Sequence, residues 1–458
     1  MTNPTPTGTL DLLDLLDHLV RRARAAGADA ADAMAVDTVS QSAASRFGAL
    51  ERVNRAESAR LGLRILIGRR QAVVSATDHG AETLAALVER AVAMARQVPE
   101  DPFCGLAEPE TLAAGWPDLD LLDPVEPDAA TLAERARAAE AAALAVPGVV
   151  NSRVVEAGWS RSAIALVTSG GFKGRYETSR HSLYALMLAA GEGEGGGQGG
   201  LERDYEHDAR THAGDLRDPA AVGRQAGERA VRRLGARKVA SCKVPVVFEA
   251  RVAASLLDHF VGAASGPAVA RGTSFLKDRM GAAILPAAVT IRDDPHRRRG
   301  LRSRPFDAEG AATRPLSLVE AGRLASWLLD ARSARQLGRP ATGHAARGAG
   351  GLPSPAPANL TLDPGTASPT ALIGAIADGF YVTELMGMGV NLVTGDYSRG
   401  ASGFWIEQGV LTHPVNEVTI AGNLADMLRT LEAADDLDPH SGLDSPTVRI
   451  DGMTVAGR

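Results

Sequence analysis

The feature that most constrains the fold is an order of secondary-structure elements that occurs twice in the first half of the chain. The first occurrence begins with apolar residues from Leu10 to Val20 that recur at helical spacing. About four short strand-like runs follow between residues 33 and 76. A second helix then starts near Asp78, which is its expected N-cap. This pattern predicts one unit of helix, strands and helix.

The second occurrence has the same order of elements. Asp128 is the expected N-cap of a helix that runs to Val146, and about four strand-like runs follow between residues 149 and 190. A further helix starts at Asp218–Pro219, because an aspartate N-cap is there followed by proline at the first helical position. The likeness lies in the architecture and not in the sequence. It predicts an α/β region built of two helix–strands–helix units.

Beyond Ala236 the pattern changes. A strand at Val244–Glu249 and a short helix at Val252–Val261 are followed by strands and glycine-rich turns, with a long surface loop expected at residues 339–359. The predicted fold class is therefore α+β, with a β-rich second half. We expect an N-terminal unit at 1–98, a Pro/Asp/Leu-rich linker at 99–127, a second unit at 128–238 and a β-rich C-terminal domain at 239–458.

Composition excludes several classes of protein. The 458 residues carry 49 Lys and Arg against 55 Asp and Glu, a net charge of −6, which disfavours a general nucleic-acid binder. Cys104 and Cys242 are the only cysteines, so a disulfide scaffold is excluded and a reducing compartment is favoured. The N-terminus lacks the pattern of a secretory signal, and no apolar run is long enough to span a membrane. We expect a cytoplasmic protein.

Two clusters are typical of functional sites, but a structural interpretation is favoured for both. Gly191–Gly200 contains a GxGxxG spacing, yet its two glutamates would repel phosphate, so a flexible hairpin loop is preferred to a dinucleotide site. Glu206, His207 and His212 lie close together in sequence. Their spacing does not match a zinc helix, so a solvated strand end is preferred to a metal site.

A structural interpretation is also favoured for three further features. His259 lies on the helix at 252–261 without a second histidine within one or two turns, so a core histidine is favoured over a zinc ligand. Ser398 and Ser402 are not in a G-x-S-x-G elbow, and Asp396 with Arg399 could pair to shape their glycine-rich loop. The arginine run at 297–304 lacks interleaved aromatic residues and predicts a solvated loop rather than a nucleic-acid patch.

Six long stretches in the second half occur in an order that is typical of one known family. The stretches are PFDAEGAATR from Pro305, EAGRLASWLLD from Glu320, DGFYVTELMGMGVN from Asp378, TGDYSRGASGFWIEQG from Thr394, PVNEVTIAGNL from Pro414 and PTVRIDGMTVAG from Pro446. With these stretches the chain resembles the TldD/TldE family, and its TldE branch, which is also called PmbA or modulator of DNA gyrase. The resemblance covers nearly the whole chain.

The resemblance implies a cytosolic TldD–TldE zinc metalloprotease that acts on unfolded or small peptides. In the TldD branch two histidines of an HExxxH helix and a cysteine near the C-terminus hold the zinc, and the motif's glutamate acts as general base. This sequence departs from that pattern. The motif should fall around residues 256–264, where only His259 remains, and the cysteine should fall within 437–446, where His440 stands instead. His259 and His440 are therefore vestigial metal-site positions, and too few donors remain for a zinc ion.

The leading hypothesis is a non-catalytic TldE-type subunit without a cofactor of its own, whose TldD-type partner carries the zinc. It would close the chamber and offer strand edges to an extended peptide. The alternative is a homodimeric peptide-binding or scaffold protein, and a DNA-linked modulator is disfavoured by the net charge. The residues expected to face the chamber and substrate are Gly395, Asp396, Tyr397, Ser398, Arg399, Gly400 and Ser402.

Overall fold

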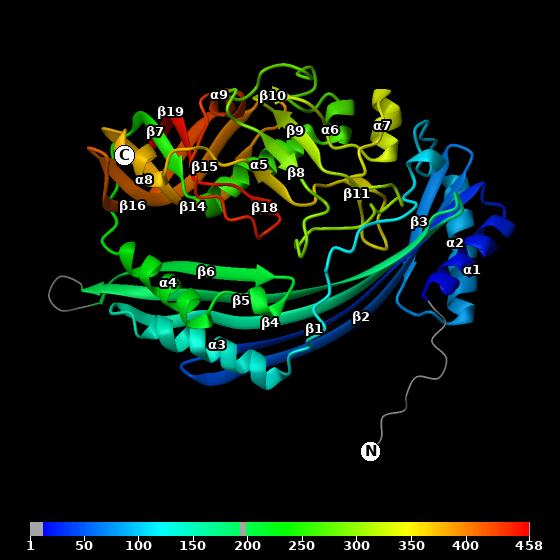
Figure 1. Cartoon of the computed structure of the whole chain (residues 1–458), viewed down its shortest axis with the longest axis horizontal. Coiled ribbons are helices and arrows are strands. Elements are labelled where there is room, and N and C mark those ends of the chain that lie inside the picture. Colours follow the sequence, from blue (N-terminus) through cyan, green and yellow to red (C-terminus); the bar gives the residue numbers. More distant parts are fainter. Residues whose placement is uncertain (1–11, 193–197, 458) are drawn as a thin grey trace.

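The computed structural model describes residues 12–192 and 198–457 and consists of two layers (Figure 1). The lower layer is a long, curved antiparallel sheet with helices at both ends. The C-terminal half forms the upper layer and lies on the concave face of this sheet. The protein is therefore α+β, with an N-terminal α/β region and a β-rich C-terminal part, as the sequence predicts.

Both predicted units contribute to one six-stranded sheet of order β3-β2-β1-β4-β5-β6, in which β1 pairs with β4. Each unit has three strands, so the predicted four per unit were wrong. Two of the runs predicted between residues 33 and 76 are one continuous strand, β1, because its Ser40–Ser42 stretch lacks apolar residues but stays extended. The strands are β1 Ala30–Arg46, β2 Ala49–Ile67, β3 Arg70–Ala76, β4 Val149–Thr168, β5 Lys173–Glu192 and β6 Gln198–Arg210.

Four helices cover the ends of this sheet on its other face. One core lies between α1, α2 and the right-hand end in Figure 1, and another lies between α3, α4 and the left-hand end. Ala35 in the first core and Ala43 in the second are an even number of residues apart on β1, so both cores lie on one face. The helices are α1 Leu12–Ala25, α2 Ala81–Gln97, α3 Ala129–Leu144 and α4 Pro219–Arg232.

The predicted N-caps of α3 and α4 are confirmed. The Thr131 amide donates to Asp128 Oδ1 at 2.7 Å, and the Ala221 amide donates to Asp218 Oδ2 at 3.2 Å. The N-cap of α2 is Gly80 and not Asp78. Asp78 instead accepts hydrogen bonds from the Gly80 amide and the Thr83 hydroxyl, just before the helix. The loop predicted at Gly191–Gly200 lies partly outside the described residues, and its described residues belong to the end of β5 and the start of β6.

The C-terminal half contains two main sheets. One has the order β16-β15-β14-β7-β19-β17, and an added β16–β19 pairing closes five of its strands into a ring. The other has the order β10-β9-β8-β13-β18, and α5 packs within the core between them. The first sheet comprises β7 Cys242–Phe248, β14 Asp378–Val390, β15 Asp396–Glu407, β16 Val410–Asn423, β17 Glu432–Ala433 and β19 Val448–Ala456.

Short elements complete this half. The second sheet comprises β8 Ile291–Asp293, β9 Leu316–Glu320, β10 Arg323–Leu324, β13 Leu360–Leu362 and β18 Leu443–Asp444, and the small hairpin comprises β11 Ala345–Ala346 and β12 Ser354–Pro355. The helices are α5 Ala250–Ala264, α6 Gly266–Ala270, α7 Ala331–Leu337, α8 Pro369–Gly374 and α9 Leu424–Arg429. None of the helices within residues 12–192 and 198–457 is long and apolar enough to cross a membrane.

Residues 339–359 do not form the predicted surface loop. They fold into the β11–β12 hairpin, and His344, Ala345 and Ala349 in this segment are buried. Its backbone approaches β2 so closely that a Cβ on Gly62 would lie 1.6 Å from the Ala349 carbonyl oxygen. The absence of a side chain at Gly62 therefore allows close packing between β2 and this segment.

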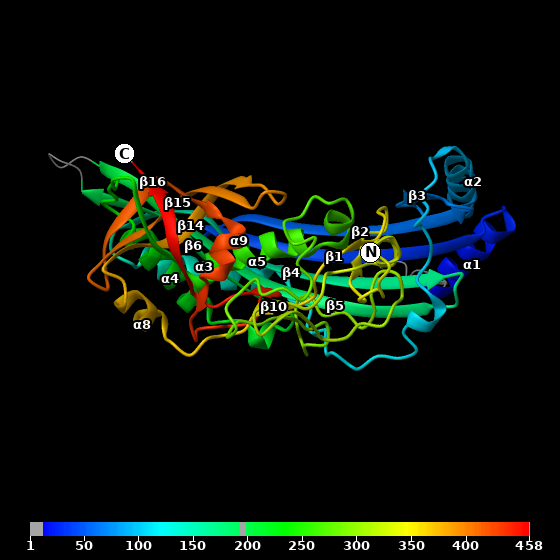
Figure 2. The same ribbon diagram turned by 90° about the horizontal axis from the view of Figure 1, so that it is seen from above.

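The segment between α2 and α3 connects the layers along the side of the sheet. The Leu121 carbonyl accepts a hydrogen bond from the Ser179 amide of β5 at 2.9 Å. Ion pairs join Asp101 to Arg332 and Glu108 to Arg335 in the C-terminal half. In the view from above, the segment passes beside both layers (Figure 2). It therefore fastens the C-terminal half to the sheet.

Candidate functional site

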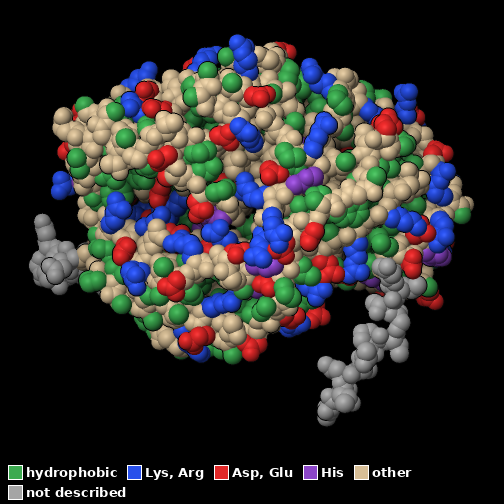
Figure 3. Space-filling model, viewed as in Figure 1, with side chains coloured by type: hydrophobic (Ala, Val, Ile, Leu, Met, Phe, Trp, Pro, Cys, Tyr) green, Lys and Arg blue, Asp and Glu red, His purple; other side chains and the backbone are tan. Residues whose placement is uncertain are grey.

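A cavity of about 560 Å³ lies between the two layers. One wall comes from β6 and α4 of the lower layer. The other comes from the start of α5, from β14 and from residues 436–447 of the upper layer. Figure 3 shows charged side chains of both signs where the layers meet on the left. The lining residues are Glu206, His207, Arg217, Gln225, Arg229, Glu249, Ala250, Arg251, Ala254, Pro369, Tyr381, Asp436, Asp438, His440, Ser441, Leu443, Asp444, Ser445 and Thr447.

A chain of alternating charges crosses the cavity from one layer to the other. Arg229 of α4 contacts Glu206 of β6 at 2.6 Å and Glu249 at 2.9 Å. Glu249 also pairs with Arg251 at 2.9 Å, and Arg251 reaches back to Asp204 of β6 at 2.8 Å. These carboxylates and guanidinium groups are largely buried, so each charge depends on its partners. This series of ion pairs fixes the width of the cavity.

Opposing effects act on the pKa of Asp204, which belongs to this series of ion pairs. Burial alone would raise the pKa of its carboxyl group, but the hydrogen bonds and charge of Arg251 and the charge of Arg233 hold that pKa below its usual value. Asp204 is therefore ionised near neutral pH. Arg251 also stacks over the Tyr205 ring at 4.8 Å, which orients its guanidinium group at the cavity wall.

Two histidines line the cavity from opposite layers. His207 projects from β6, and His440 follows Asp438, whose carbonyl oxygen lies 2.9 Å from His440 Nδ1. Burial lowers the pKa of His207, the charge of Glu206 opposes this shift, and the proximity of His440 adds to it. His207 is therefore neutral near neutral pH. A neutral imidazole can accept or donate a hydrogen bond to a peptide backbone.

Only one of the two segments in which the resemblance places zinc ligands lines this cavity. Several residues of 437–446 line it, including His440, whereas none of residues 256–264 does, His259 included. His259 is buried, with Nε2 at 3.4 Å from Arg399 Nη1 and its ring edge against Tyr397. His259 and His440 therefore lie in different surroundings.

The residues present do not fit a zinc ion. In the part of the chain that the structure describes, no three or more His, Cys, Asp and Glu side chains are grouped so that they could hold a metal. His259 Nε2 faces the Arg399 guanidinium group, whose positive charge would repel a metal ion. Burial lowers the pKa of His259, and the charge of Arg399 lowers it further against the opposing effect of Asp258.

The glycine-rich segment at 394–403 is a strand and not a loop. Most of it belongs to β15, which pairs with β14 and β16. Asp396 accepts a hydrogen bond from the Thr394 hydroxyl at 2.6 Å, whereas Arg399 donates to the Met386 carbonyl, so the predicted Asp396–Arg399 pair is wrong. The strand alternation separates these two side chains. None of the seven predicted chamber residues Gly395, Asp396, Tyr397, Ser398, Arg399, Gly400 and Ser402 lines the 560 Å³ cavity.

Those seven residues differ in exposure and role. Tyr397 is a core residue, 1% exposed, and its hydroxyl group has no hydrogen-bond partner among the residues that the structure describes. Ser402 is also buried, whereas Asp396 and Ser398 are exposed. Gly395 has a φ of 86° in the turn between β14 and β15, which favours glycine.

One solvent-exposed assignment was also wrong. Glu206 and His212 are buried rather than at a solvated strand end, because the upper layer and the segment between α2 and α3 cover β6. His212 Nε2 lies 3.0 Å from the Asp120 carbonyl oxygen. The arginine run is an exposed loop, as predicted. Arg298 and Arg299 are exposed and both pair with Asp120, and Arg297 pairs with Asp444.

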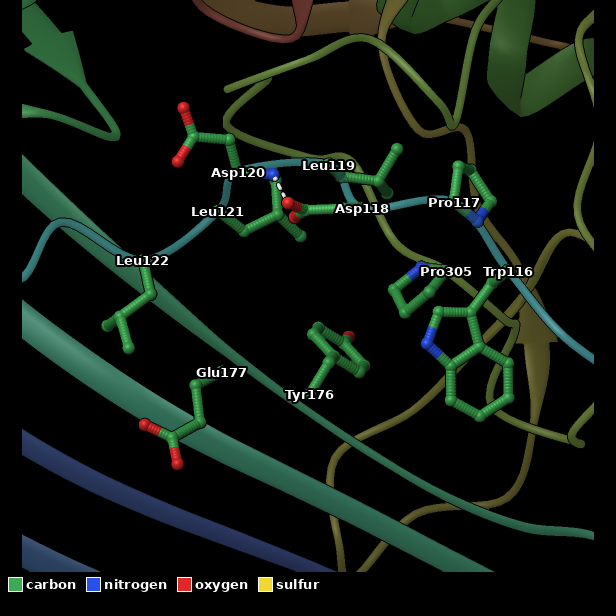
Figure 4. A pocket seen from close by; sticks show the side chains of 10 residues that line it. All are labelled: Trp116, Pro117, Asp118, Leu119, Asp120, Leu121, Leu122, Tyr176, Glu177 and Pro305. Atoms are coloured by element: carbon green, nitrogen blue, oxygen red, sulfur yellow. Dashed lines mark hydrogen bonds between the residues drawn. The ribbon is translucent and has the colours of Figure 1, made fainter.

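A second cavity, of about 470 Å³, lies where the segment between α2 and α3 passes over β5 (Figure 4). Trp116 and Tyr176 form its aromatic wall, and Pro305 lies beside them. The Asp120 amide donates to Asp118 Oδ1 at 2.9 Å and shapes the upper rim. Glu177 is held by Arg161 and Arg175, so this carboxylate is already neutralised by protein groups.

Sequence reasoning missed the central residues of the larger cavity. Arg229, Glu249, Arg251 and Tyr381 come from α4, the end of β7, α5 and β14, and no local motif connects them. The one available signal was the alternating charge of Glu249 and Arg251 immediately after a buried strand. Only the crossing of the two layers brings these elements together.

Known proteins are similar to this chain over almost its whole length. Three family models match, described as PmbA/TldA metallopeptidase domain 1 at residues 31–95, the central domain at 122–234 and the C-terminal domain at 241–457. The metalloprotease PmbA of Escherichia coli O157:H7 is 38% identical over 92% of this chain and 91% of its own length. The PmbA homologue of Haemophilus influenzae is 36% identical over 93% and 92%.

Solved structures share the fold. A candidate modulator of DNA gyrase from Bacteroides thetaiotaomicron superposes with a TM-score of 0.88 at 26% identity, covering 97% of this chain and 98% of that chain. TldE from Thermococcus kodakarensis superposes with a TM-score of 0.83 at 19% identity, covering 97% and 100%, which shows the fold alone. The family models and the PmbA relatives together establish that this chain belongs to the PmbA/TldD family of metallopeptidases.

Proposed function

We propose that this chain is the non-catalytic, TldE-type subunit of a peptide-cleaving assembly, and that a TldD-type partner supplies the catalytic zinc. The observation that carries the proposal is the missing donor set. Of the positions where the resemblance places ligands, residues 256–264 retain only His259, which faces Arg399, and residues 437–446 retain His440 in place of the cysteine. Catalytic zinc requires about three protein ligands, which these positions do not provide.

In this proposal the 560 Å³ cavity holds part of an extended peptide substrate. Its wall supplies side chains that recognise a peptide backbone or its termini: Arg251 for carbonyl or carboxylate oxygens, His207 as a neutral donor or acceptor, and His440 as a further hydrogen-bonding side chain. Few apolar side chains line the cavity. Recognition through backbone groups would give little preference for sequence, which suits unfolded or small peptides.

The test measures peptide cleavage and metal content with the full chain, alone and mixed with its TldD-type partner from the same organism. We expect the chain alone to be inactive and free of stoichiometric zinc, and the mixture to cleave peptides and contain zinc. Peptide hydrolysis by the chain alone with bound zinc would contradict the proposal. An active mixture whose zinc resides in this chain would contradict it as well.

A second measurement tests the role of the cavity. His440→Ala and Arg251→Met should lower kcat/KM of the mixed assembly, whereas Arg21→Ala, at an exposed site on α1, should not. Circular dichroism and complex formation should be unchanged in His440→Ala, because its side chain bonds only to neighbouring Asp438. An unchanged kcat/KM for both cavity variants would show that the cavity does not bind the substrate.

A further inference from the structure

A small cavity of about 90 Å³ lies between the two layers, apart from the 560 Å³ cavity. No residue lines both cavities, so an inference about the smaller one does not rest on the proposed function. Its apolar wall includes Met34 of β1, Ile164 and Leu166 of β4, and Phe306 of the upper layer. A cavity of this volume admits several water molecules or one small organic molecule.

Two guanidinium groups of the wall have donors without an acceptor. Arg347 follows β11, and its side chain is 1% exposed. The Nε atoms of Arg347 and Arg304 are both closed to solvent, and neither has a hydrogen-bond partner among the described residues. Burying a donor without an acceptor is costly, and buried polar groups usually have a partner. Because both residues line the 90 Å³ cavity, an acceptor in it can bond to both.

Positive charge is in excess beside this cavity. Arg347 and Arg64 both pair with the single carboxylate of Asp32. Arg304 has no ion pair within 4 Å in the described part of the chain, and its Nη2 donates instead to the Ala356 carbonyl oxygen at 2.6 Å. Three guanidinium groups therefore share one directly paired carboxylate, which favours an anionic ligand.

The other carboxyl groups nearby balance this charge incompletely. Asp307 also lines the cavity, but its oxygens already accept hydrogen bonds from the amides of Glu309, Ala311 and Ala345. Burial raises the pKa of Asp307, and burial together with the charge of Asp307 raises the pKa of Glu309 to about 7. Glu309 is therefore partly protonated near neutral pH and does not fully compensate the arginines.

We propose that this cavity binds a short-chain aliphatic monocarboxylate. The carboxylate accepts hydrogen bonds from the Nε groups of Arg304 and Arg347, because guanidinium groups match the planar geometry of a carboxylate. The alkyl chain lies against Ile164, Leu166 and Phe306. Sulfate or phosphate fits this wall poorly, because some of its oxygens would face apolar side chains without a hydrogen-bond partner.

The Tyr176 ring lies between this cavity and the 470 Å³ cavity of Figure 4, since Tyr176 lines both. The ring packs edge-on against Phe306, with centroids 5.3 Å apart. Movement of this one ring would join the two cavities, so the larger cavity provides the approach for the ligand. A ligand held by Arg347 of the upper layer and Ile164 of the lower layer would also strengthen the contact between the layers.

Propionate is the probe for a test on the full chain. Saturation-transfer-difference NMR should show saturable binding, and differential scanning calorimetry should show a melting temperature that rises with the propionate concentration. Sodium chloride and sodium sulfate at the same ionic strength should not reproduce this rise. No propionate binding, or an equal rise with chloride or sulfate, would overturn the proposal.

Two variants locate the site. Arg304→Met removes one guanidinium group, and Ile164→Phe fills the cavity while it leaves the charges in place. Each should raise the Kd for propionate by roughly tenfold or more. Arg46→Met, the same change at an exposed position of β1, should leave the Kd unchanged. If Arg304→Met does not fold, Ile164→Phe alone decides: propionate binding of natural strength in the folded Ile164→Phe variant would place the ligand elsewhere and overturn the proposal.

Discussion

At the scale of single residues, the most constrained site is the buried charge cluster between the layers. Asp32 of β1 contacts Arg64 of β2 at 2.6 Å and also Arg347 of the β11–β12 hairpin, and all three side chains are almost fully buried. Arg64 also faces Glu309 at 3.9 Å. Removing one partner of such a cluster leaves an uncompensated buried charge, so these residues hold the upper layer in one position.

Gly62 lies beside this cluster and permits the closest approach of the layers. Gly62→Ala would place a Cβ 1.6 Å from the Ala349 carbonyl oxygen, so the backbone must shift. We expect the free energy of unfolding to fall by about 1–3 kcal/mol, measured by urea denaturation. Gly115→Ala is the matched control, because no atom lies within 4 Å of its added Cβ. Equal stability of the two variants would show that the layers separate freely at this point.

Glu309 makes stability depend on pH. Its burial, together with the charge of Asp307, raises its pKa from 4.5 to about 7. Since the folded state binds the proton more tightly, the stability from this group is complete below pH 4.5 and is lost as the pH rises through about 7.

Glu309→Gln should therefore flatten the fall in unfolding free energy between about pH 5 and pH 8, by on the order of 1–3 kcal/mol. Urea denaturation at several pH values measures this. Glu110→Gln, on the short helix at 109–111, is the control and should keep the natural slope. If Glu309→Gln keeps that slope too, another group causes the pH dependence.

At the scale of elements, small residues allow α3 and α4 to pack closely. A Cβ on Gly223 of α4 would lie 1.8 Å from the Ala139 carbonyl oxygen of α3. The core that these helices form on the sheet consists largely of alanine. The helices can therefore approach each other at backbone distance, which positions Arg229 of α4 at the cavity.

Gly223→Ala should lower the midpoint of thermal unfolding. In an open helix this change would stabilise by about 1 kcal/mol through helix propensity. Here the contact with Ala139 outweighs that gain, because main-chain atoms cannot rotate away. Gly214→Ala, where no atom lies within 4 Å of the new Cβ, provides the comparison. A higher midpoint for Gly223→Ala would mean that α3 and α4 have room to separate.

At the scale of the whole molecule, the layers are joined by charges at the cavity, and by aromatic packing together with the Asp32–Arg347 pair at the other end. The chain from Arg229 through Glu249 to Arg251 joins them at the cavity. Phe306 of the upper layer packs against Phe172 and Tyr176 of β5 or its preceding turn, with ring centroids 4.8 and 5.3 Å apart. These contacts hold the two layers as one body.

Folding of the isolated chain should therefore be independent of zinc. A ligand that binds the folded state raises the unfolding temperature, and a bound structural metal makes that temperature sensitive to chelators. We expect the melting temperature to stay the same with added zinc and after treatment with EDTA, measured by differential scanning calorimetry. A saturable rise with zinc would reveal a donor set that the described residues do not form.

The sequence by itself determined the fold class, the helix–strands–helix order of the two N-terminal units, the caps of α3 and α4 and the family. These follow from local signals, such as Asp218 before Pro219, and from long motifs in a defined order. It also predicts that His259 and His440 lack the companions that zinc requires. Local patterns are sufficient here because capping and periodicity involve residues within a few positions of each other.

Only the tertiary structure decided which distant residues meet. The 339–359 segment has the composition of a surface loop, yet it is buried because Gly62 lets the Ala349 backbone approach. Arg399 faces His259 and not Asp396, and Arg251 reaches Asp204, because strands and helices far apart in sequence cross at those points. Such contacts arise from the packing of two layers on each other, and no local pattern in the chain encodes that packing.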